Sequence, residues 1–517
     1  MHDAKTSNNL KRLFISLFFC DFHNTNAKVK NFIYFYNLKK ITFSKKYDNF
    51  VSRYYNQMLV THCILKHFKF DPTQDQKTFI DLFSLFMTKK ESYKTFLLKG
   101  YAGTGKTTLV SSIVKACKEL NVPVILLAPT GRAAKVLSNY SSAPASTIHR
   151  AIYHKKTMDI SSNFVLGFNK ISNALFVVDE ASMINTAGEG FFGTGDLLSD
   201  LVQYVFSGAP NTKLLLLGDD AQLPPVFQEH SPALDVKKLE SIGLDVTTHT
   251  LTEVLRQSEE SGILVNATHI RENISEPQSL QLECFPDVKR VDGTNFVECL
   301  EQSFATVGME ETLVVTRSNK MASLYANGIR NRILNKEGML SNGDKLMVLK
   351  NNYFFGGDYG LELIANGDMA EIVRIGKSKE LYGFNFRNLT LYFSDYSYEI
   401  DVTILEESLT CVTPAELQEL NAKLFKAVEE DYAHIKSKRE RYKKMREDKY
   451  LNALQVKLAY AITCHKAQGG QWKHIYVDMG RVKKEEIDAS YMRWLYTAVT
   501  RATEKLYLVQ FADDYFK

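Results

Sequence analysis

The eight residues from Gly100 to Thr107, with the sequence GYAGTGKT, point most directly to chemistry. They fit the pattern G-x-x-x-x-G-K-[ST], in which glycines let consecutive backbone N–H groups surround the α- and β-phosphates of a nucleotide. Lys106 is placed to reach the β- and γ-phosphates, and the Thr107 hydroxyl to ligate Mg²⁺. The segment therefore predicts a binding site for a nucleoside triphosphate.

The flanking residues support this interpretation. The apolar run 95–99 predicts a short buried strand, and 108–117 has the spacing of a helix. A strand, a glycine loop and a helix in this order place the phosphates at a helix N-terminus. The residues predicted to contact the triphosphate are Gly100, Gly103, Thr104, Gly105, Lys106, Thr107 and Thr108.

Acidic and amide side chains follow two further apolar runs. Asp179 and Glu180 come directly after 174–178, and Gln222 follows 213–217. Asp179 is predicted to hold Mg²⁺ together with Thr107, and Glu180 to orient and deprotonate the attacking water. Gln222 is placed to sense the γ-phosphate or to hydrogen-bond that water. Together these residues predict a nucleotide hydrolase.

Two arginines indicate a site shared with a second domain. Arg256 and Arg501 both lie among apolar or small residues, a setting that suits a desolvated guanidinium aimed at an anion. Such an arginine can neutralise charge on the transferring phosphoryl group. A structural pair with a carboxylate is the alternative for either arginine taken alone.

The elements that must position these residues fall into several units, as a length of 517 residues predicts. Strands and helices alternate over about 70–217, which predicts an α/β nucleotide-binding domain. Similar strands at 312–315, 474–477 and 505–509 predict a second one. Between its parts lie a β-rich insert, about 341–412, and a charged helical segment at 415–450. We expect a solvated helical excursion there, with a nucleic-acid contact surface as the alternative.

Charge and cysteine usage limit the class of protein. The formal net charge is +5, and residues 1–57 hold ten Lys or Arg against three Asp or Glu. A basic coat over the whole surface is therefore not expected, and a nucleic-acid site must be a local groove. The seven cysteines form no C-x-x-C pair, which favours a reducing, cytoplasmic setting. The apolar run 13–20 is too short to span a membrane.

Ten blocks in order resemble the superfamily 1 helicases, in the branch of RecD-like and Dda-like DNA helicases. The blocks are PTQDQ (72–76), GYAGTGKT (100–107), APTGRAA (128–134), STIH (146–149), VDEAS (178–182), GDDAQLPP (218–225), LRQ (255–257), TRSN (316–319), TCHKAQG (463–469) and TAVTRA (497–502). One such block is weak evidence, but ten in family order make coincidence negligible.

The resemblance implies an α/β fold of two tandem RecA-like P-loop NTPase domains. The expected division is a basic N-terminal extension at 1–57, a first domain at 58–245 with a hairpin insert at about 150–172, a second domain at 246–340 and 451–517, an SH3-like β insert at 341–412, and the charged helical insert at 413–450. In relatives the hairpin splits the duplex, and Tyr153, Phe164 and Phe168 are candidate wedge rings.

The resemblance also implies roles for single residues. Gln76 would read the adenine edge, Gln222 would couple the γ-phosphate to the other domain, and Arg256 and Arg501 would reach the phosphates across the interdomain cleft. Pro129 would stack on a base. The residues expected to hold the DNA are Pro129, Thr130, Thr147 and His149 in the first domain, with Thr316, Arg317, Asn319, Thr463, His465 and Lys466 in the second.

The expected function is that of a monomeric, cytoplasmic DNA helicase, a DNA-dependent ATPase that uses ATP and Mg²⁺. The resemblance implies 5′→3′ movement on single-stranded DNA and at forks, in DNA repair or recombination. Two alternatives remain open from the sequence. One is a single-strand translocase that does not separate duplexes, and the other is an accessory motor subunit of a recombination or nuclease complex.

Overall fold

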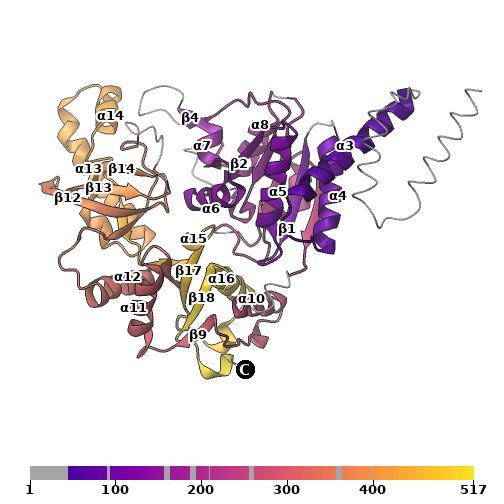
Figure 1. Cartoon of the computed structure of the whole chain (residues 1–517). Helices are drawn as coiled ribbons and strands as arrows, with labels where there is room; N and C mark the ends of the chain where they lie inside the picture. The colour runs from indigo at the N-terminus through magenta and orange to yellow at the C-terminus, as the bar shows by residue number, and fades with distance from the viewer. Residues whose placement is uncertain are drawn as a thin grey trace, which may run out of the picture.

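The computed structural model describes residues 45–89, 93–155, 164–186, 194–208, 210–226, 228–254, 261–356, 364–395 and 397–516. Figure 1 shows three bodies: an indigo-to-purple α/β body, a pink-to-yellow α/β body below it, and an orange body rich in strands beside both. Two tandem α/β units with a β-rich insert are therefore confirmed. The apolar run 13–20 lies outside the described residues.

The first sheet holds six parallel strands in the order β3-β2-β6-β7-β1-β8. These strands are β1 (Lys94–Gly100), β2 (Val124–Ala128), β3 (Ala145–Thr147), β6 (Leu175–Val178), β7 (Lys213–Gly218) and β8 (Asp245–Leu251). Because β8 pairs with β1 along its whole length, this sheet extends to Leu251 and passes the domain boundary predicted at residue 245.

Helices cover both faces of this sheet because side chains alternate along each strand. Phe96 and Leu98 share a buried cluster with α4 and α5, whereas Leu97 faces the cluster that contains α8. The helices of this body are α3 (Lys45–His67), α4 (Gln74–Thr88), α5 (Lys106–Glu119), α6 (Gly131–Ser141), α7 (Ile148–Ile152), α8 (Leu197–Phe206) and α9 (Val236–Ser241). None of the helices within the described ranges is long and apolar enough to cross a membrane.

Helix α3 crosses the predicted N-terminal boundary of the first domain. It runs without interruption through residue 57, where the basic extension was expected to give way to the first domain. Its C-terminal half carries Cys63 and Ile64 into the core that α4 and α5 form against the sheet. Residues 45–57 are therefore helical and continuous with the first α/β body.

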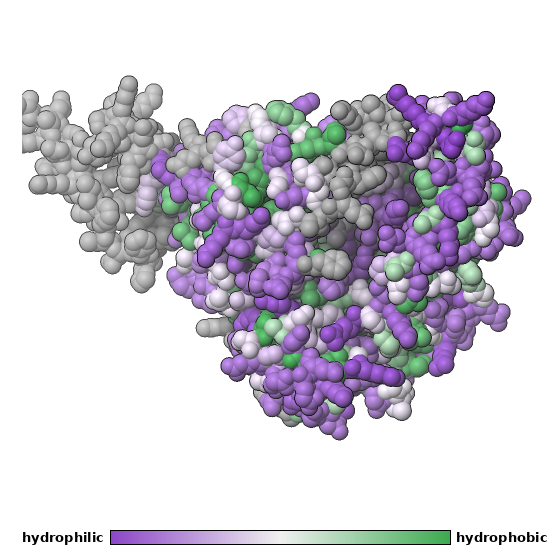
Figure 2. All heavy atoms as spheres, turned by 180° about the vertical axis from the view of Figure 1, so that it is seen from behind, coloured by the Kyte–Doolittle hydropathy of each residue, from purple (hydrophilic) through white to green (hydrophobic). Residues whose placement is uncertain are grey.

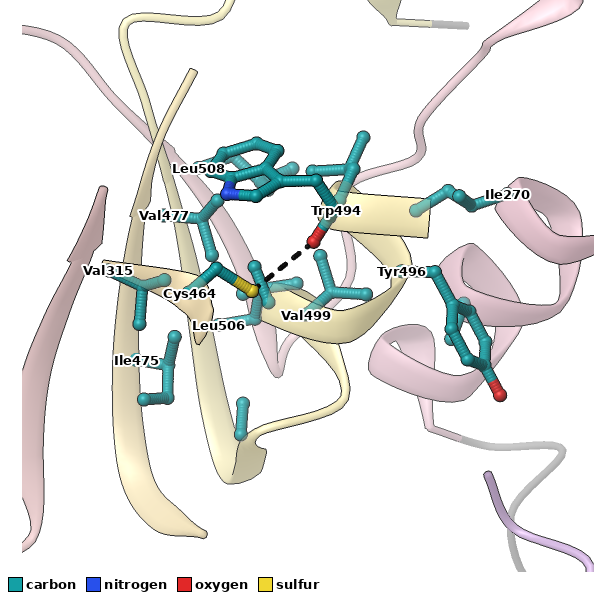
Figure 3. Close-up of a cluster of buried hydrophobic side chains, with 14 of the residues drawn as sticks. Ile270, Val315, Cys464, Ile475, Val477, Trp494, Tyr496, Val499, Leu506 and Leu508 are labelled. Carbon is teal, nitrogen blue, oxygen red and sulfur yellow. Dashed lines mark hydrogen bonds between the residues drawn. The ribbon is translucent and has the colours of Figure 1, made fainter. Parts of the chain in front are cut away.

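The second sheet holds five parallel strands in the order β16-β10-β17-β18-β9. Its strands are β9 (Val288–Val291), β10 (Thr312–Thr316), β16 (Ala461–Thr463), β17 (Trp472–Asp478) and β18 (Ala502–Val509). Its helices are α10 (Gly262–Glu272), α11 (Phe296–Val307), α12 (Asn319–Gly328), α15 (Cys464–Ala467) and α16 (Ala489–Val499). Figure 3 shows the apolar cluster that joins this sheet to α15 and α16, with the Cys464 thiol donating to the Trp494 carbonyl at 3.5 Å.

The third body is an antiparallel sheet in the order β14-β13-β12-β11-β15. Its strands are β11 (Lys345–Val348), β12 (Met369–Leu381), β13 (Phe384–Phe393), β14 (Tyr398–Leu405) and β15 (Val456–Leu458). Helices α13 (Pro414–Asp431) and α14 (Lys438–Arg446) pack on it through a cluster that includes Phe386, Leu424 and Met445. The charged helical segment and this accessory sheet thus form one body, whose SH3-like character stays a prediction.

A two-stranded hairpin lies at the predicted insert. Its strands are β4 (Tyr153–Lys155) and β5 (Phe164–Leu166), paired antiparallel. Of the candidate wedge rings, Tyr153 is buried and its hydroxyl donates to Asp200 at 2.7 Å, so it does not act as a wedge in this arrangement. Phe168 is 61% exposed and stays a candidate.

Helix α6 contacts all three bodies. It belongs to the first body, and its Lys135 donates to the Ser394 carbonyl of the accessory sheet at 2.9 Å and lies 3.3 Å from the Asp395 carboxylate. From the second body, Gly469 approaches so closely that a Cβ built on it would lie 2.7 Å from the Cβ of Ala133. The three bodies therefore meet on one helix.

Candidate nucleotide site and nucleic-acid track

Strand β1 and helix α5 place the phosphate loop as predicted, because β1 ends at Gly100 and α5 begins at Lys106. Gly103 and Gly105 have φ angles of +79° and +82°, which glycine adopts without steric cost. The Lys106 ammonium donates to the carbonyls of Gly100 and Tyr101. The loop thus presents its backbone amides at the N-terminus of a helix, an arrangement that binds phosphate.

The phosphate loop is braced from α4. Gln76 is only 1% exposed, and its Nε2 donates to the Thr104 carbonyl at 2.9 Å. Its Oε1 accepts from the Thr73 amide at 3.0 Å in the N-terminal cap of α4. The buried Thr104 hydroxyl in turn donates to the Tyr101 carbonyl at 2.8 Å. Gln76 therefore supports the loop, a role that the sequence did not indicate, and its reading of adenine stays a prediction.

The predicted acidic pair follows β6, beside the phosphate loop. The Asp179 amide donates to the Leu127 carbonyl of β2 at 3.0 Å, and its carboxylate accepts from the Glu180 amide at 2.8 Å and from the Tyr140 hydroxyl. Glu180 has a φ of +52°, a conformation that costs a residue with a side chain about 1–2 kcal/mol. Such backbone strain is typical of functional sites.

Arg501 reaches this acidic pair from the second body. Its guanidinium lies 3.8 Å from the Glu180 carboxylate and is 4% exposed. Hydrogen bonds to the carbonyls of Thr497 at 3.0 Å and Gly470 at 3.2 Å hold it in place. Burial raises the pKa of the Glu180 carboxyl above its ordinary value, and the charge of Arg501 opposes that shift. The other predicted arginine, Arg256, lies outside the described residues.

The segment after β7 is held by the second body. The Leu223 amide donates to the Thr497 hydroxyl at 2.8 Å, and Gln468 Nε2 donates to the Leu223 carbonyl at 2.8 Å. Gln222, next to this contact, is 7% exposed, and its Oε1 has no hydrogen-bond partner among the described residues. Thr497 and Gln468 both lie in sequence blocks that resemble those of the helicases, but nothing in these blocks indicated that the two residues hydrogen-bond to this segment.

These residues fit ATP and Mg²⁺. Thr107, exposed on the first turn of α5, and Asp179 offer oxygen atoms, the ligands that Mg²⁺ takes. Among the described residues there is no group of three or more His, Cys, Asp or Glu that could hold a metal by itself. A site with few protein ligands suits Mg²⁺, which is commonly bound by one or two side chains together with substrate phosphates. The free Gln222 oxygen adds an acceptor for a bound water.

The predicted DNA-contacting residues of the first body follow the carboxyl ends of β2 and β3. Pro129 and Thr130 come directly after β2, and Thr147 ends β3. The hydroxyls of Thr130 and Thr147 cap the N-termini of α6 and α7. Burial lowers the pKa of His149 to about 4, so this side chain is neutral at pH 7 and offers hydrogen bonds rather than charge.

Only some of the predicted DNA-contacting residues of the second body lie at the surface. Thr316 is fully buried and its hydroxyl donates to the Ser318 carbonyl at 3.0 Å, so the prediction that it contacts DNA does not agree with its position. Its neighbour Arg317 is exposed, with its guanidinium 5.2 Å from the centre of the Tyr491 ring. Asn319 begins α12 on the same loop.

The loop after β16 carries the remaining predicted contacts. Thr463 is half-buried, His465 is exposed, and the Lys466 ammonium donates to Asn366 of the accessory body. Burial lowers the pKa of Lys466 to about 8, and the nearby charge of Lys457 acts in the same direction. Burial also lowers the pKa of His465. A phosphate bound here would restore the full charge of Lys466.

Protein families match at both ends of this arrangement. The family described as AAA domain matches residues 84–291, which begin within α4 and include the whole first sheet. The family described as UvrD-like helicase C-terminal domain matches residues 458–509, which include β16, β17, α16 and β18. The two matches therefore cover the phosphate loop, the acidic pair and Arg501.

Known helicases are similar in sequence. The ATP-dependent RecD2 DNA helicase of Deinococcus radiodurans is 26% identical over 318 residues, which cover 58% of this chain and 41% of that protein. This chain thus matches less than half of that relative's length. The ATP-dependent DNA helicase dda of Enterobacteria phage T4 is 40% identical over 80 residues, 15% of this chain and 18% of that protein. These matches confirm the predicted resemblance to superfamily 1 helicases of the RecD-like branch.

A solved structure of a Pif1 helicase from Bacteroides, in complex with ADP-AlF3 and single-stranded DNA, is also similar. It aligns over 86% of this chain and 93% of its own length, at 14% identity and a TM-score of 0.45.

Proposed function

We propose that this protein is an ATP-driven motor that moves along single-stranded DNA and unwinds duplex DNA, in the 5′→3′ direction. The observation that carries the proposal is the division of the nucleotide site between two bodies. Lys106, Asp179 and Glu180 lie in the first, and Arg501 reaches Glu180 from the second at 3.8 Å. A kinase or simple GTPase needs only the first of these bodies, whereas a motor needs hydrolysis to depend on how both are placed.

Each residue has a distinct part in the proposed reaction. Lys106 would bind the β- and γ-phosphates, and Glu180 would take the proton of the attacking water. A pKa raised by burial makes Glu180 a stronger base than an exposed carboxylate. Arg501 would neutralise charge that develops on the γ-phosphate. Mg²⁺, held by Thr107 and Asp179, would screen the phosphate oxygens.

Nucleotide and DNA would be coupled through the closure of the two bodies. DNA-contacting residues follow strand ends in both sheets, so a change in the distance between the bodies changes the distance between two grips on one strand. A triphosphate favours the closed arrangement because only this arrangement brings Arg501 to it. We further propose that the protein acts as a cytoplasmic monomer on single strands and forks, in repair or recombination.

The Lys106→Ala variant tests this function. We expect it to abolish DNA-stimulated ATP hydrolysis and to leave DNA binding nearly unchanged, because Lys106 contacts phosphate and not the strand. Lys118→Ala, an exposed position near the end of the same helix, is the matched control. Full ATP turnover in Lys106→Ala would overturn the site assignment.

Unwinding of tailed duplexes tests the substrate and the polarity. A 5′-tailed duplex should be opened, and a 3′-tailed duplex of the same sequence should not. ATP hydrolysis on single strands without any strand separation would support a translocase instead.

A further inference from the structure

A compact basic segment lies at the end of the accessory body. Residues 436–449 hold eight Lys or Arg and three Asp or Glu, so this short stretch alone has the formal net charge of the whole chain, +5. Helix α13, which precedes it, has five acidic and two basic residues. Charges of opposite sign are thus separated on neighbouring helices and not mixed as on an ordinary solvated surface.

Packing holds this basic segment in a defined position. Met445 of α14 is 1% exposed and lies in the cluster that joins α13 and α14 to the accessory sheet. The Tyr432 hydroxyl donates to Asp448 at 3.0 Å, and the Asp448 carboxylate also accepts from the amides of Tyr450 and Leu451 at 2.8 and 2.9 Å. The basic side chains are therefore presented by a fixed helix and not by a free tail.

The exposed basic side chains on and around α14 are together called the basic surface of α14. It consists of Lys379, Lys436, Arg439, Lys443, Lys444 and Lys449, all exposed. Lys379 of β12 and Lys449 lie over the same Tyr450 ring, each 5.0 Å from its centre, so the strand and the helical segment share this surface. Figure 2, which views the molecule from behind, shows hydrophilic side chains gathered at the end of the molecule that holds α13 and α14 in Figure 1.

Few acidic groups neutralise this surface. Lys444 lies 4.0 Å from Glu447, the C-cap residue of α14. In the part of the chain that the structure describes, Lys436, Arg439 and Lys443 make no ion pair within 4.0 Å. Such a density of uncompensated positive charge fits a polyanion.

The aromatic rings distinguish between two kinds of nucleic acid. Single strands are held by rings on which bases stack. Here Lys438 lies 5.8 Å from the centre of the Tyr442 ring, the partly exposed Phe425 stacks on the same ring at 6.3 Å, and Lys379 and Lys449 lie over Tyr450. Tyr442 and Tyr450 are therefore already in contact with other side chains. Duplex DNA instead carries one phosphate charge per about 1.7 Å of its axis. Helix α14, nine residues or about 13 Å long, spans several of these charges.

We propose that the basic surface of α14 binds the phosphate backbone of double-stranded DNA, ahead of the point where the strands separate. Figure 1 shows α14 and β4 both at the top of the view, and the proposal places the incoming duplex on this side. The inference rests on the proposed function for its choice of DNA as the polyanion. The basic surface of α14 would thus add a second DNA contact, independent of base sequence, to the predicted contacts with the single strand.

The test replaces the three unpaired cations together, as Lys436→Gln, Arg439→Gln and Lys443→Gln. Binding to a blunt duplex and to an oligo(dT) strand is measured between about 50 and 200 mM salt. The slope of log K against log salt is negative, and each lost phosphate contact makes it less steep by about 0.9. The slope for the duplex should therefore become less steep by about two to three, and the affinity for the duplex should fall by about tenfold. Binding to oligo(dT) and the ATP hydrolysis it stimulates should not change.

Two further variants keep the result interpretable. Lys436→Arg with Lys443→Arg retains the charge and should retain duplex binding. Lys77→Gln, Lys118→Gln and Lys289→Gln together remove three exposed charges elsewhere and should leave the duplex slope unchanged. An unchanged duplex slope in the triple glutamine variant, or an equal loss on oligo(dT), would overturn the inference. If the parent protein hydrolysed no ATP on DNA, the proposed function would fail, and the duplex measurement would still decide this inference.

Discussion

The Tyr496 hydroxyl of the second α/β body donates a hydrogen bond of 2.6 Å to Asp219 of the first. The same oxygen accepts one of 2.9 Å from the Ala102 amide in the phosphate loop. Figure 3 shows this hydroxyl pointing away from the apolar cluster around Cys464. One buried oxygen therefore joins the phosphate loop and the segment after β7 to helix α16.

Removing this oxygen should uncouple the two bodies. In Tyr496→Phe, the buried Asp219 carboxylate keeps the Ala221 amide as a donor but loses the Tyr496 hydroxyl, and the Ala102 amide loses its acceptor, at a cost of about 1–3 kcal/mol. We expect kcat for DNA-stimulated ATP hydrolysis to fall more than KM for ATP rises, because the loop stays intact while the second body is held less firmly. Tyr491→Phe is the matched control, since its hydroxyl donates only within the second body. Equal effects of the two substitutions would contradict a coupling role.

Arg501 should act on hydrolysis rather than on DNA binding. Arg501→Ala is expected to lower kcat by about 10³-fold or more, the range found for arginines that contact a transferring phosphoryl group. Arg501→Lys should restore little, because an ammonium does not reproduce the planar guanidinium. Arg493→Ala removes a different contact across the same interface, to the Asp220 carbonyl, and should cost far less. Loss of single-strand affinity in Arg501→Ala would count against this role.

Lys466 predicts a pH dependence of DNA binding. Its pKa of about 8 means that the side chain is charged below that pH and neutral above it. Because phosphate binds the charged form, the Kd for single-stranded DNA should rise between about pH 7 and 9. Lys466→Arg, whose charge does not titrate in this range, should bind with a flatter profile. Identical pH profiles for the two proteins would show that Lys466 does not contact the DNA.

Thr316 and Thr463 should respond differently to the loss of a hydroxyl. Thr316→Val leaves the Ser318 carbonyl without its buried donor, so it should lower the free energy of unfolding by about 1 kcal/mol. Single-strand affinity should hardly change. Thr463→Val changes a half-buried residue that is predicted to contact DNA, so it should weaken DNA binding with little loss of stability. Thermal melting and fluorescence anisotropy distinguish the two.

The parts of the site that were predictable depend on local chain geometry. Gly103 and Gly105 need positive φ angles, and Asp179 and Glu180 follow a strand at the carboxyl edge of a parallel sheet, so spacing alone indicates their places. Whether a side chain at the end of a strand is buried depends on the elements packed around the strand, and the neighbouring residues in the sequence do not determine it. Thr316 is buried at the end of β10, a central strand between β16 and β17, and no pattern in residues 312–316 reveals this position.

Contacts between elements far apart in the sequence, within a body and between bodies, were also beyond the sequence. Gln76 resembles an adenine-reading residue, yet its bond to Thr104 depends on how α4 packs beside the phosphate loop. In the sequence, Tyr496 is one of several aromatic and apolar residues of a helix that is expected to be buried. Its contact with the segment after β7 is visible only in the folded structure. Residues 1–57 were set apart from the first domain by their basic composition, whereas the core beneath α3 comes from other helices.

The accessory sheet is covalently part of the second body, but Lys135 of the first body holds its β13–β14 turn at Ser394 and Asp395. The insert is thus attached to the second body through the chain and to the first body through side-chain contacts. A rotation that opens the cleft must either release the turn from α6 or bend the strands that connect the insert to its own domain. The contacts of Lys135 with this turn therefore oppose separation of the first body from the second.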